Sequence, residues 1–177
     1  MNYFMGIDPG KNGAYAVVNE NGTSITYGKF PRIGTEIDLK ELRLLFDRLI
    51  DDYTVMRLPV DSLTIAIEDV HALFMSSAKS TFNFGGICLA LEICICLHGY
   101  HKVKPKDWQK LAWEGITKQF KFVKGKKKSD TKKNSLLAVK RMFPDADLRG
   151  TVKSTTDHDG IVDALLIAEY CRRTYGK

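Results

Sequence analysis

The chain has 177 residues, a length typical of one domain that buries enough surface to fold without a disulfide or a structural metal. Hydrophobic residues make up 44% and aromatic residues 10% of the sequence, which excludes a largely disordered protein. Lysine and arginine (27) outnumber aspartate and glutamate (21), so the formal net charge is +6. This balance suits a polyanionic partner, although many basic proteins bind none.

The sequence predicts neither a secretory signal nor a membrane span. Residues 1–6 lack the basic region that precedes the apolar core of a signal peptide. The most membrane-like apolar run, Gly86–Leu97, has twelve residues and contains Glu92, so it is too short to cross a bilayer. We therefore expect a cytoplasmic protein without a membrane partner.

The cysteines indicate free thiols rather than a metal site. No CxxC pair occurs among Cys88, Cys94, Cys96 and Cys171. Cys94 and Cys96 with His98 would need a fourth ligand and a turn to hold zinc. Buried, reduced thiols are the better interpretation.

Apolar runs and turn residues predict three strands and a helix in the first part of the chain. A strand over Tyr3–Ile7 stops at Asp8-Pro9-Gly10. Strands Ala14–Val18 and Ser24–Phe30 flank Asn19-Glu20-Asn21-Gly22, which predicts a hairpin because Asn-Gly tolerates positive φ at both turn positions. A helix follows Asp38, with Glu41 three residues later as in a capping box.

The rest of the chain alternates between strands and helices. The predicted segments are a strand over Leu63–Ile67, a long and mostly buried helix over Ala78–Leu97, a strand over Tyr100–Val103, a short helix from Pro105, a helix capped by Ser129 that reaches about Met142, and a last helix that begins at 157–159. A three-stranded meander followed by such elements indicates one α/β domain over 1–177 with a mixed five-stranded sheet.

Two acidic residues end strands that are otherwise apolar. Asp8 follows the first strand and Glu68 follows the strand Leu63–Ile67. Ligands of open α/β sheets collect at the carboxyl ends of strands, so the two acids meet if their strands are neighbours. A turn aspartate and a strand-end glutamate, both solvated, would give the same pattern.

The last helix carries an acid that solvation does not explain. Asp163 lies inside the apolar surface of this helix, with Leu166 and Ile167 on its face. A buried and unpaired carboxylate costs several kcal/mol or becomes protonated. Asp159, one turn earlier, could equally be a helix N-cap. Asp8, Glu68, Asp159 and Asp163 make sense together if they bind Mg²⁺, and two such ions would support hydrolysis of a phosphodiester.

A basic segment complements these acids. Eight lysines lie between Lys118 and Lys133, and Phe120 and Phe122 alternate with them. A solvated surface would explain the charge, but the aromatic residues and the acids favour a flexible basic loop, loosened at Gly125, that grips a nucleic-acid backbone. A second polar and aromatic stretch, 76–84, includes Lys79 and Phe82 and could contact DNA, or its aromatic residues could belong to the core.

The sequence resembles the RuvC-type Holliday-junction resolvases of the ribonuclease-H-like nuclease superfamily, with the small phage and mobile-element branch most similar. The resemblance covers nearly the whole chain in order. The matching segments are Gly6-Ile7-Asp8-Pro9-Gly10 with Gly13, Ile65-Ala66-Ile67-Glu68, Ser77-Ala78 with Gly86, Pro105 with Trp108, Lys128-Ser129, Phe143-Pro144, His158-Asp159-Gly160 and Asp163-Ala164-Leu165.

The resemblance implies a ribonuclease-H-like fold and Mg²⁺-dependent cleavage of four-way DNA junctions by a homodimer, with Mn²⁺ as a substitute and no nucleotide cofactor. By position, Asp8 and Asp163 would hold one metal and Glu68 a second. Resolvases commonly carry an acid or a histidine where this chain has Gly160, so Asp159 would complete the set, with His158 and Asp157 as alternatives. The expected DNA-binding residues are Lys79, Phe82, Lys104, Lys124, Lys126, Lys127, Lys128 and Lys132, and Lys104 or one of Lys126–Lys128 could stabilise the charge of the transition state.

Three other functions fit parts of the sequence. One is a related nuclease for other branched or single-stranded DNA, and another is a junction-binding protein without catalysis. The third is an actin-like phosphotransferase, suggested by Asp8-Pro9-Gly10-Lys11, although that class normally needs two such domains to close over a nucleotide.

Overall fold

A five-stranded mixed sheet forms the centre of the structure, a computed structural model that describes residues 1–54, 62–70 and 77–176. Its strand order is β3 (Ser24–Lys29), β2 (Ala14–Asn19), β1 (Asn2–Asp8), β6 (Ser62–Glu68) and β7 (His101–Val103). β1, β2 and β3 form an antiparallel meander, and β6 and β7 continue the sheet in parallel to β1. This arrangement confirms the fold class predicted from the sequence.

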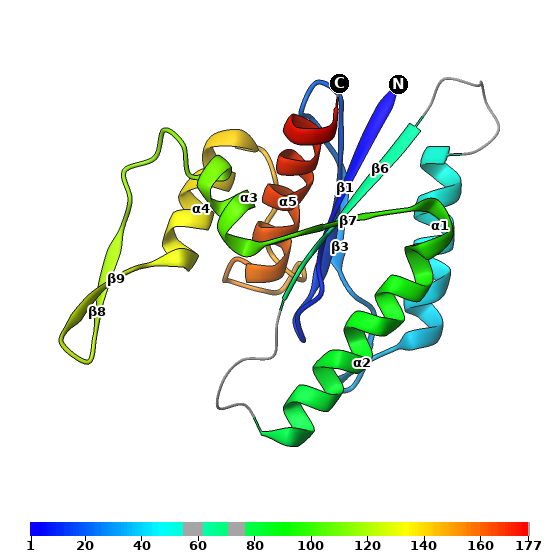
Figure 1. Cartoon of the computed structure of the whole chain (residues 1–177), viewed down its shortest axis with the longest axis horizontal. Helices are drawn as coiled ribbons and strands as arrows, with labels where there is room; N and C mark the ends of the chain where they lie inside the picture. The colour runs from blue at the N-terminus through cyan, green and yellow to red at the C-terminus, as the bar shows by residue number, and fades with distance from the viewer. Residues whose placement is uncertain (55–61, 71–76, 177) are drawn as a thin grey trace.

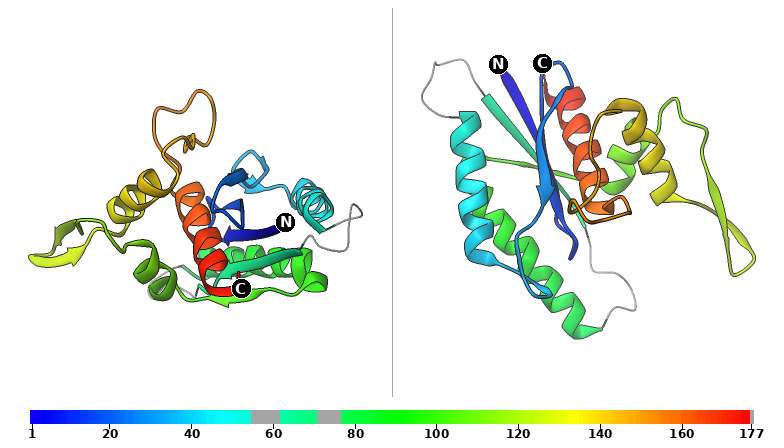
Figure 2. Two further views of the ribbon diagram at one scale, coloured as in Figure 1. Left: turned by 90° about the horizontal axis from the view of Figure 1, so that it is seen from above. Right: turned by 180° about the vertical axis from the view of Figure 1, so that it is seen from behind.

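Helices cover both faces of the sheet (Figure 1). α5 (Asp159–Tyr175) packs on one face, with α3 (Pro105–Ala112) and α4 (Thr131–Met142) beyond it. α1 (Leu39–Thr54) and α2 (Ala78–Ile95) cover the other face, as the view from above in Figure 2 shows. Side chains alternate between the faces of a strand, so Phe4 joins the core beneath α5 while Met5 and Ile7 join the core beneath α1 and α2.

Gly6 lets α5 lie directly on the central strand. A Cβ atom at Gly6 would be 2.2 Å from the backbone nitrogen of Ala168 and 2.3 Å from the carbonyl oxygen of Ala164. Only glycine therefore permits this approach of helix to strand. The contact fixes α5 along β1 and brings the first turns of α5 to the strand end at Asp8 (Figure 1).

The hairpin turns differ from the sequence-based expectation. The β2–β3 turn spans the predicted segment Asn19–Gly22, since the Gly22 N–H donates to the Asn19 carbonyl, but only Gly22 has positive φ (81°) and Asn21 does not. The predicted basic loop is instead a second hairpin, β8 (Phe120–Val123) and β9 (Lys126–Ser129). Lys124 and Gly125 both have positive φ, 50° and 72°, as a type I′ turn requires.

α2 is much less buried than predicted. Its buried residues are Leu91, Cys94 and Ile95, whereas Phe82 is 82% exposed. With the 3₁₀ turn η1 (Cys96–His98), it is the one helix among the described residues that is long and apolar enough to cross a membrane. This corrects the shorter run read from the sequence, although helices that pack on a sheet share the property.

Several boundaries shift by a few residues. Asp38 caps α1 as expected, since its Oδ1 accepts from the N–H groups of Lys40 and Glu41. Asp130 rather than Ser129 caps α4, and His158 rather than an aspartate caps α5. Two short strands, β4 (Arg32–Ile33) and β5 (Glu36–Ile37), were not predicted. All four cysteines are free thiols, but Cys96 is exposed and Cys88 is only partly buried.

We predict that Gly6→Ala destabilises the protein by about 3 kcal/mol or more, because its Cβ would meet backbone atoms that cannot rotate away. Urea unfolding would measure the change. Gly85→Ala is the matched control, since a Cβ at Gly85 meets nothing within 4 Å and alanine favours a helix by up to about 1 kcal/mol. Equal stability of the two variants would contradict the close approach of α5 to β1.

Candidate active site

Two carboxylates leave the sheet side by side at the carboxyl ends of β1 and β6. These strands are parallel neighbours, with Ile7 opposite Ile67, so Asp8 and Glu68 follow at the same edge. Asp8 Oδ1 accepts the Gly10 N–H at 3.1 Å. The indole N–H of the fully buried Trp108 donates to Glu68 Oε1 at 2.8 Å. Both acids are partly buried.

α5 brings two further acids to this edge. Asp163 is partly buried, and Ser135, a buried residue of α4, is close enough for its hydroxyl to oppose the rise in the pKa of Asp163. Asp159, the first residue of α5, is exposed and forms an ion pair with Lys132 at the start of α4. Asp157, the other candidate in this region, pairs with Lys140 at 3.1 Å and lies outside the helix.

Electrostatic repulsion links the acids of the edge. Burial, and then the charges of Asp163 and Glu68, raise the pKa of Asp8 well above its usual value. Burial, and then the charge of Glu68, raise the pKa of Asp163 to about 7. Burial also raises the pKa of Glu68, although the Trp108 indole opposes this. Among the described residues none of these three acids forms an ion pair, so their charges are uncompensated.

The donor set suits a hard cation. Carboxylate oxygens are the preferred ligands of Mg²⁺, and a cation would remove the repulsion that raises these pKa values. In the described part of the chain no three Asp, Glu, His or Cys side chains are close enough to hold an ion as they stand. The acids therefore form a partly assembled set, in which a cation would have to draw the carboxylates together.

Steric contacts explain why position 160, where resolvases commonly carry an acid or a histidine, is a glycine. A Cβ at Gly160 would lie 2.2 Å from the Asn12 carbonyl oxygen and 3.0 Å from Asp8 Oδ2. A side chain would therefore collide with the β1–β2 turn. His158 serves as the cap of α5, because its Nδ1 accepts the Ile161 N–H at 3.3 Å. Among Asp157, His158 and Asp159, only the charge of Asp159 raises the pKa values of both Asp8 and Asp163.

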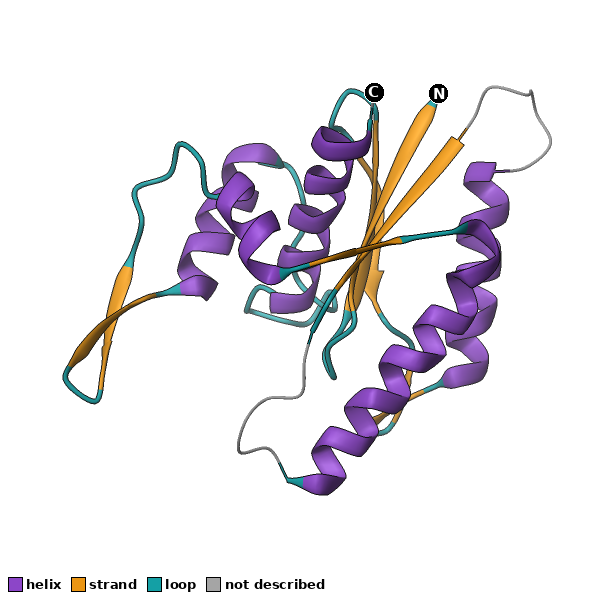
Figure 3. Ribbon diagram, viewed as in Figure 1, coloured by secondary structure: helices purple, strands orange, loops and turns teal. Residues whose placement is uncertain are grey.

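The lysine-rich hairpin projects from the body of the protein (Figure 3). Lys121 and Lys128 are opposite each other, so with Lys126 they share one face, and Phe122 lies on the other face opposite Lys127. Lys127 Nζ lies 4.4 Å from the centre of the Phe120 ring. Lys124 occupies the turn.

Buried Asn134 of α4 anchors the base of the hairpin. Its side chain accepts the Gln119 N–H at 2.7 Å and donates to the Gln119 carbonyl and to Ser129 Oγ. Lys132, two residues before it, reaches the edge through Asp159. The hairpin is therefore rooted beside the carboxylates, although its tip points away from the sheet.

The remaining predicted DNA-binding residues are also exposed. Lys79 and Phe82 lie in the first turns of α2, and Lys104 is the N-cap residue of α3, directly after β7. Part of the predicted stretch 76–84 falls outside the described residues, because the description resumes at Ser77. The sequence analysis missed Ser135 and Asn134 as supporting residues. Trp108 was noted in the sequence only with Pro105 as a matching segment, and its partner Glu68 could not be read from spacing.

Known structures share the mixed five-stranded sheet flanked by helices. The chain is similar to Thermus thermophilus RuvC in complex with a Holliday junction substrate, with a TM-score of 0.60 and 14% identity, over 98% of this chain and 96% of that chain. A second Thermus thermophilus RuvC structure gives a TM-score of 0.57 and 17% identity, over 94% of this chain and 90% of that chain. No protein-family model matches the sequence, and no curated protein matches it either. The architecture is thus the ribonuclease-H-like fold of the RuvC type.

We predict that the metal-free protein loses stability as pH rises from about 4 toward and beyond 7. The folded state holds a proton on Asp163, whose pKa of about 7 exceeds the ordinary aspartate value of 3.8, so stability falls where the unfolded chain has already released that proton. Urea unfolding in EDTA at pH 5 and pH 8 would measure this loss. Asp163→Asn should show a smaller loss, and an equal loss in both proteins would contradict the pKa assignment.

Proposed function

We propose that the protein is a Mg²⁺-dependent, structure-selective endonuclease that resolves four-way DNA junctions by paired nicks. The observation that carries the proposal is the uncompensated set of Asp8, Glu68 and Asp163 at one edge of a RuvC-type fold. A solved neighbour with this fold is a RuvC in complex with a Holliday junction substrate, which supports branched DNA as the substrate.

Three carboxylates at the sheet edge would hold the cation. Asp8, Glu68 and Asp163 would supply its oxygen ligands, the Trp108 indole N–H holds Glu68 Oε1, and Ser135 lies close to Asp163. When bound, Mg²⁺ would supply the positive charge that activates a water for attack and stabilises the departing oxyanion.

Asp159 adds a switch to this arrangement. Its carboxylate pairs with Lys132. If Asp159 served as a further ligand of the cation, Lys132 would be free to contact a DNA phosphate, and Lys104, directly after β7, would be a second basic group for the same backbone.

The lysines of the hairpin supply most of the electrostatic attraction to DNA. Lys121 and Lys128 are like charges opposite each other, which destabilises a hairpin unless a polyanion neutralises them. Asp130 compensates Lys121 only partly, at 3.5 Å. Exposed Phe122 on the opposite face is suited to contact with bases.

A homodimer accounts for the exposed side of α2. Phe82, Leu89 and Ile93 are 82%, 61% and 55% exposed, and with Gly86 they follow the alternating spacing of a helix-pairing seam. The residues of the seam are uncharged, so the seams of two identical copies would not repel each other. A Cβ at Gly86 would meet nothing within 4 Å, so this position permits close approach of a second helix. Two-fold symmetry also suits paired nicks on strands of like polarity.

The first test removes one carboxylate. We expect Asp8→Asn and Asp163→Asn to abolish Mg²⁺-dependent nicking, with a loss of at least about a hundredfold, while junction binding persists. Labelled four-way, Y-shaped and linear DNA with and without Mg²⁺ would measure both. Nicking by the variants at the wild-type rate would refute the proposal, and wild-type cleavage of the Y-shaped or single-stranded forms alone would favour a related nuclease.

The second test concerns the hairpin. Replacing Lys126, Lys127 and Lys128 by alanine should weaken junction binding and lower the slope of log affinity against log salt by about two to three. Fluorescence anisotropy at several salt concentrations would give the slope. Lys110→Ala, on exposed α3, is a single-charge control that should leave the slope nearly unchanged. An unchanged slope in the triple variant would mean that these lysines are merely solvated.

The third test concerns the dimer. Leu89→Asp with Ile93→Asp should give a monomer, because it buries like charges in the proposed seam. Sedimentation would measure the mass, and a cruciform plasmid would become a nicked circle instead of a linear product. Val152→Asp, at an 87% exposed loop residue, is the control. A double variant that remains dimeric would place the interface elsewhere.

A further inference from the structure

A small basic cavity lies beside the carboxylate edge. It has a volume of about 100 Å³ and is lined by the β1–β2 turn, the end of β3 and the cap of α5, with Lys11, Asn12, Lys29, Arg32 and His158 among its walls. Gly160 joins it to the edge, because a Cβ there would meet the Asn12 carbonyl oxygen, Asp8 Oδ2 and the His158 ring at once. We call this cavity the basic pocket.

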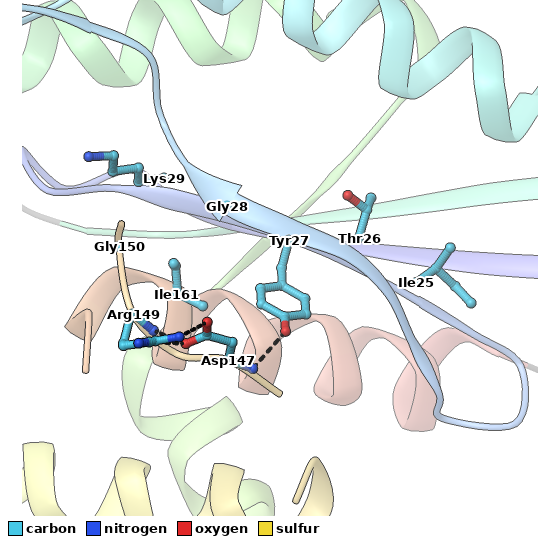
Figure 4. Close-up of a pocket in the computed structure, with 9 residues that line it drawn as sticks. All are labelled: Ile25, Thr26, Tyr27, Gly28, Lys29, Asp147, Arg149, Gly150 and Ile161. Atoms are coloured by element: carbon cyan, nitrogen blue, oxygen red, sulfur yellow. Dashed lines mark hydrogen bonds and ion pairs between the residues drawn. The ribbon is translucent and has the colours of Figure 1, made fainter. Parts of the chain in front are cut away.

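The charge of the basic pocket has no partner. No acidic residue lines it, and Lys11 and Lys29 form no ion pair or side-chain hydrogen bond with any described residue. A larger cavity of about 570 Å³ shares Lys29 but contains an Asp147–Arg149 ion pair (Figure 4). Lys29 extends away from that pair in Figure 4, so its charge is not used there.

Arg32 builds the pocket rather than merely adding charge. Its Nη1 donates to the Lys11 carbonyl at 3.2 Å and to Asn12 Oδ1 at 3.1 Å, and its Nη2 donates to the Thr35 carbonyl. These bonds hold the β1–β2 turn against β4 and β5. The turn that carries Lys11 is therefore fixed beside Asp8.

His158 contributes a donor. Its Nδ1 accepts the Ile161 N–H, so in the neutral ring the proton is on Nε2. The wall of the pocket thus combines two free ammonium groups, an anchored guanidinium and an imidazole N–H donor.

We propose that the basic pocket binds a phosphate of the DNA strand that flanks the phosphodiester at the carboxylates. The identity of the ligand as DNA rests on the proposed function. A water takes up about 30 Å³ in the liquid, so the cavity holds a few waters or one phosphate group. Without a cation the carboxylates repel the strand, and a neighbouring phosphate in the basic pocket keeps the strand at the edge. Lys11 and Lys29 bind it, and Arg32 is a positioning residue.

The experiment uses junctions in which single phosphates near the nick are replaced by neutral methylphosphonates. Binding is measured in EDTA, where cleavage cannot occur. The wild type should lose about tenfold in affinity at one or two linkages that flank the nick. Lys29→Met should bind the unmodified junction about tenfold less tightly and show no further loss at those linkages. Lys110→Met is the matched control and should lose affinity as the wild type does.

Lys11→Met repeats the test from the other free lysine, and circular dichroism confirms folding of each variant. Equal losses at every linkage in wild type and Lys29→Met would overturn the proposal. Titration with inorganic phosphate separates a free-phosphate site from a strand site, because phosphate binding without linkage-specific losses would also overturn it. A protein with these losses that never cleaves would refute the nuclease and keep the pocket, whereas cleavage without the losses would refute the pocket alone.

Discussion

The packing of α5 on β1 through Gly6 is the constraint on which the site depends. The helix backbone lies where a side chain would be, so the position of α5 along the strand is fixed by steric contact rather than by charge. This places Asp163 beside the end of β1 and sets Gly160 against the β1–β2 turn. A looser contact would leave the acids free to move apart and relieve their repulsion.

The site combines charges of both signs that are separated in space. The carboxylates lie at the sheet edge, where burial raises their pKa values, and unpaired lysines lie on both sides of them, in the basic pocket and on the hairpin. A surface of one sign would either repel DNA or fail to hold a cation. Their alternation along one edge suits a substrate that is itself negative and needs a cation to react.

The sequence predicted well wherever a residue conflicted with its surroundings. Asp163 within an apolar helix face and Glu68 after an apolar strand both indicated the edge, and the meander with the alternating elements after it indicated a mixed five-stranded sheet, whereas the adjacency of β1 and β6 came from the structure. It failed where the outcome depends on distant partners. The exposure of α2 depends on how much of the helix the sheet covers. The N-cap of α5 is the His158 ring and not an aspartate carboxylate, which depends on the local fold of the chain. Gly125 within the lysine run indicated a flexible loop, yet the positive φ of Lys124 and Gly125 closes a hairpin.

The position of Asp163 in the chain also determines when, during synthesis, the carboxylate edge is complete. Asp8 emerges early in synthesis, but its third carboxylate neighbour arrives only with α5, after every strand of the sheet. A nascent chain that has made β1, β6 and β7 therefore holds only two of the three partly buried carboxylates of the edge. The edge is completed only when the last helix docks on the finished sheet, so the order of translation makes its assembly a late event in folding.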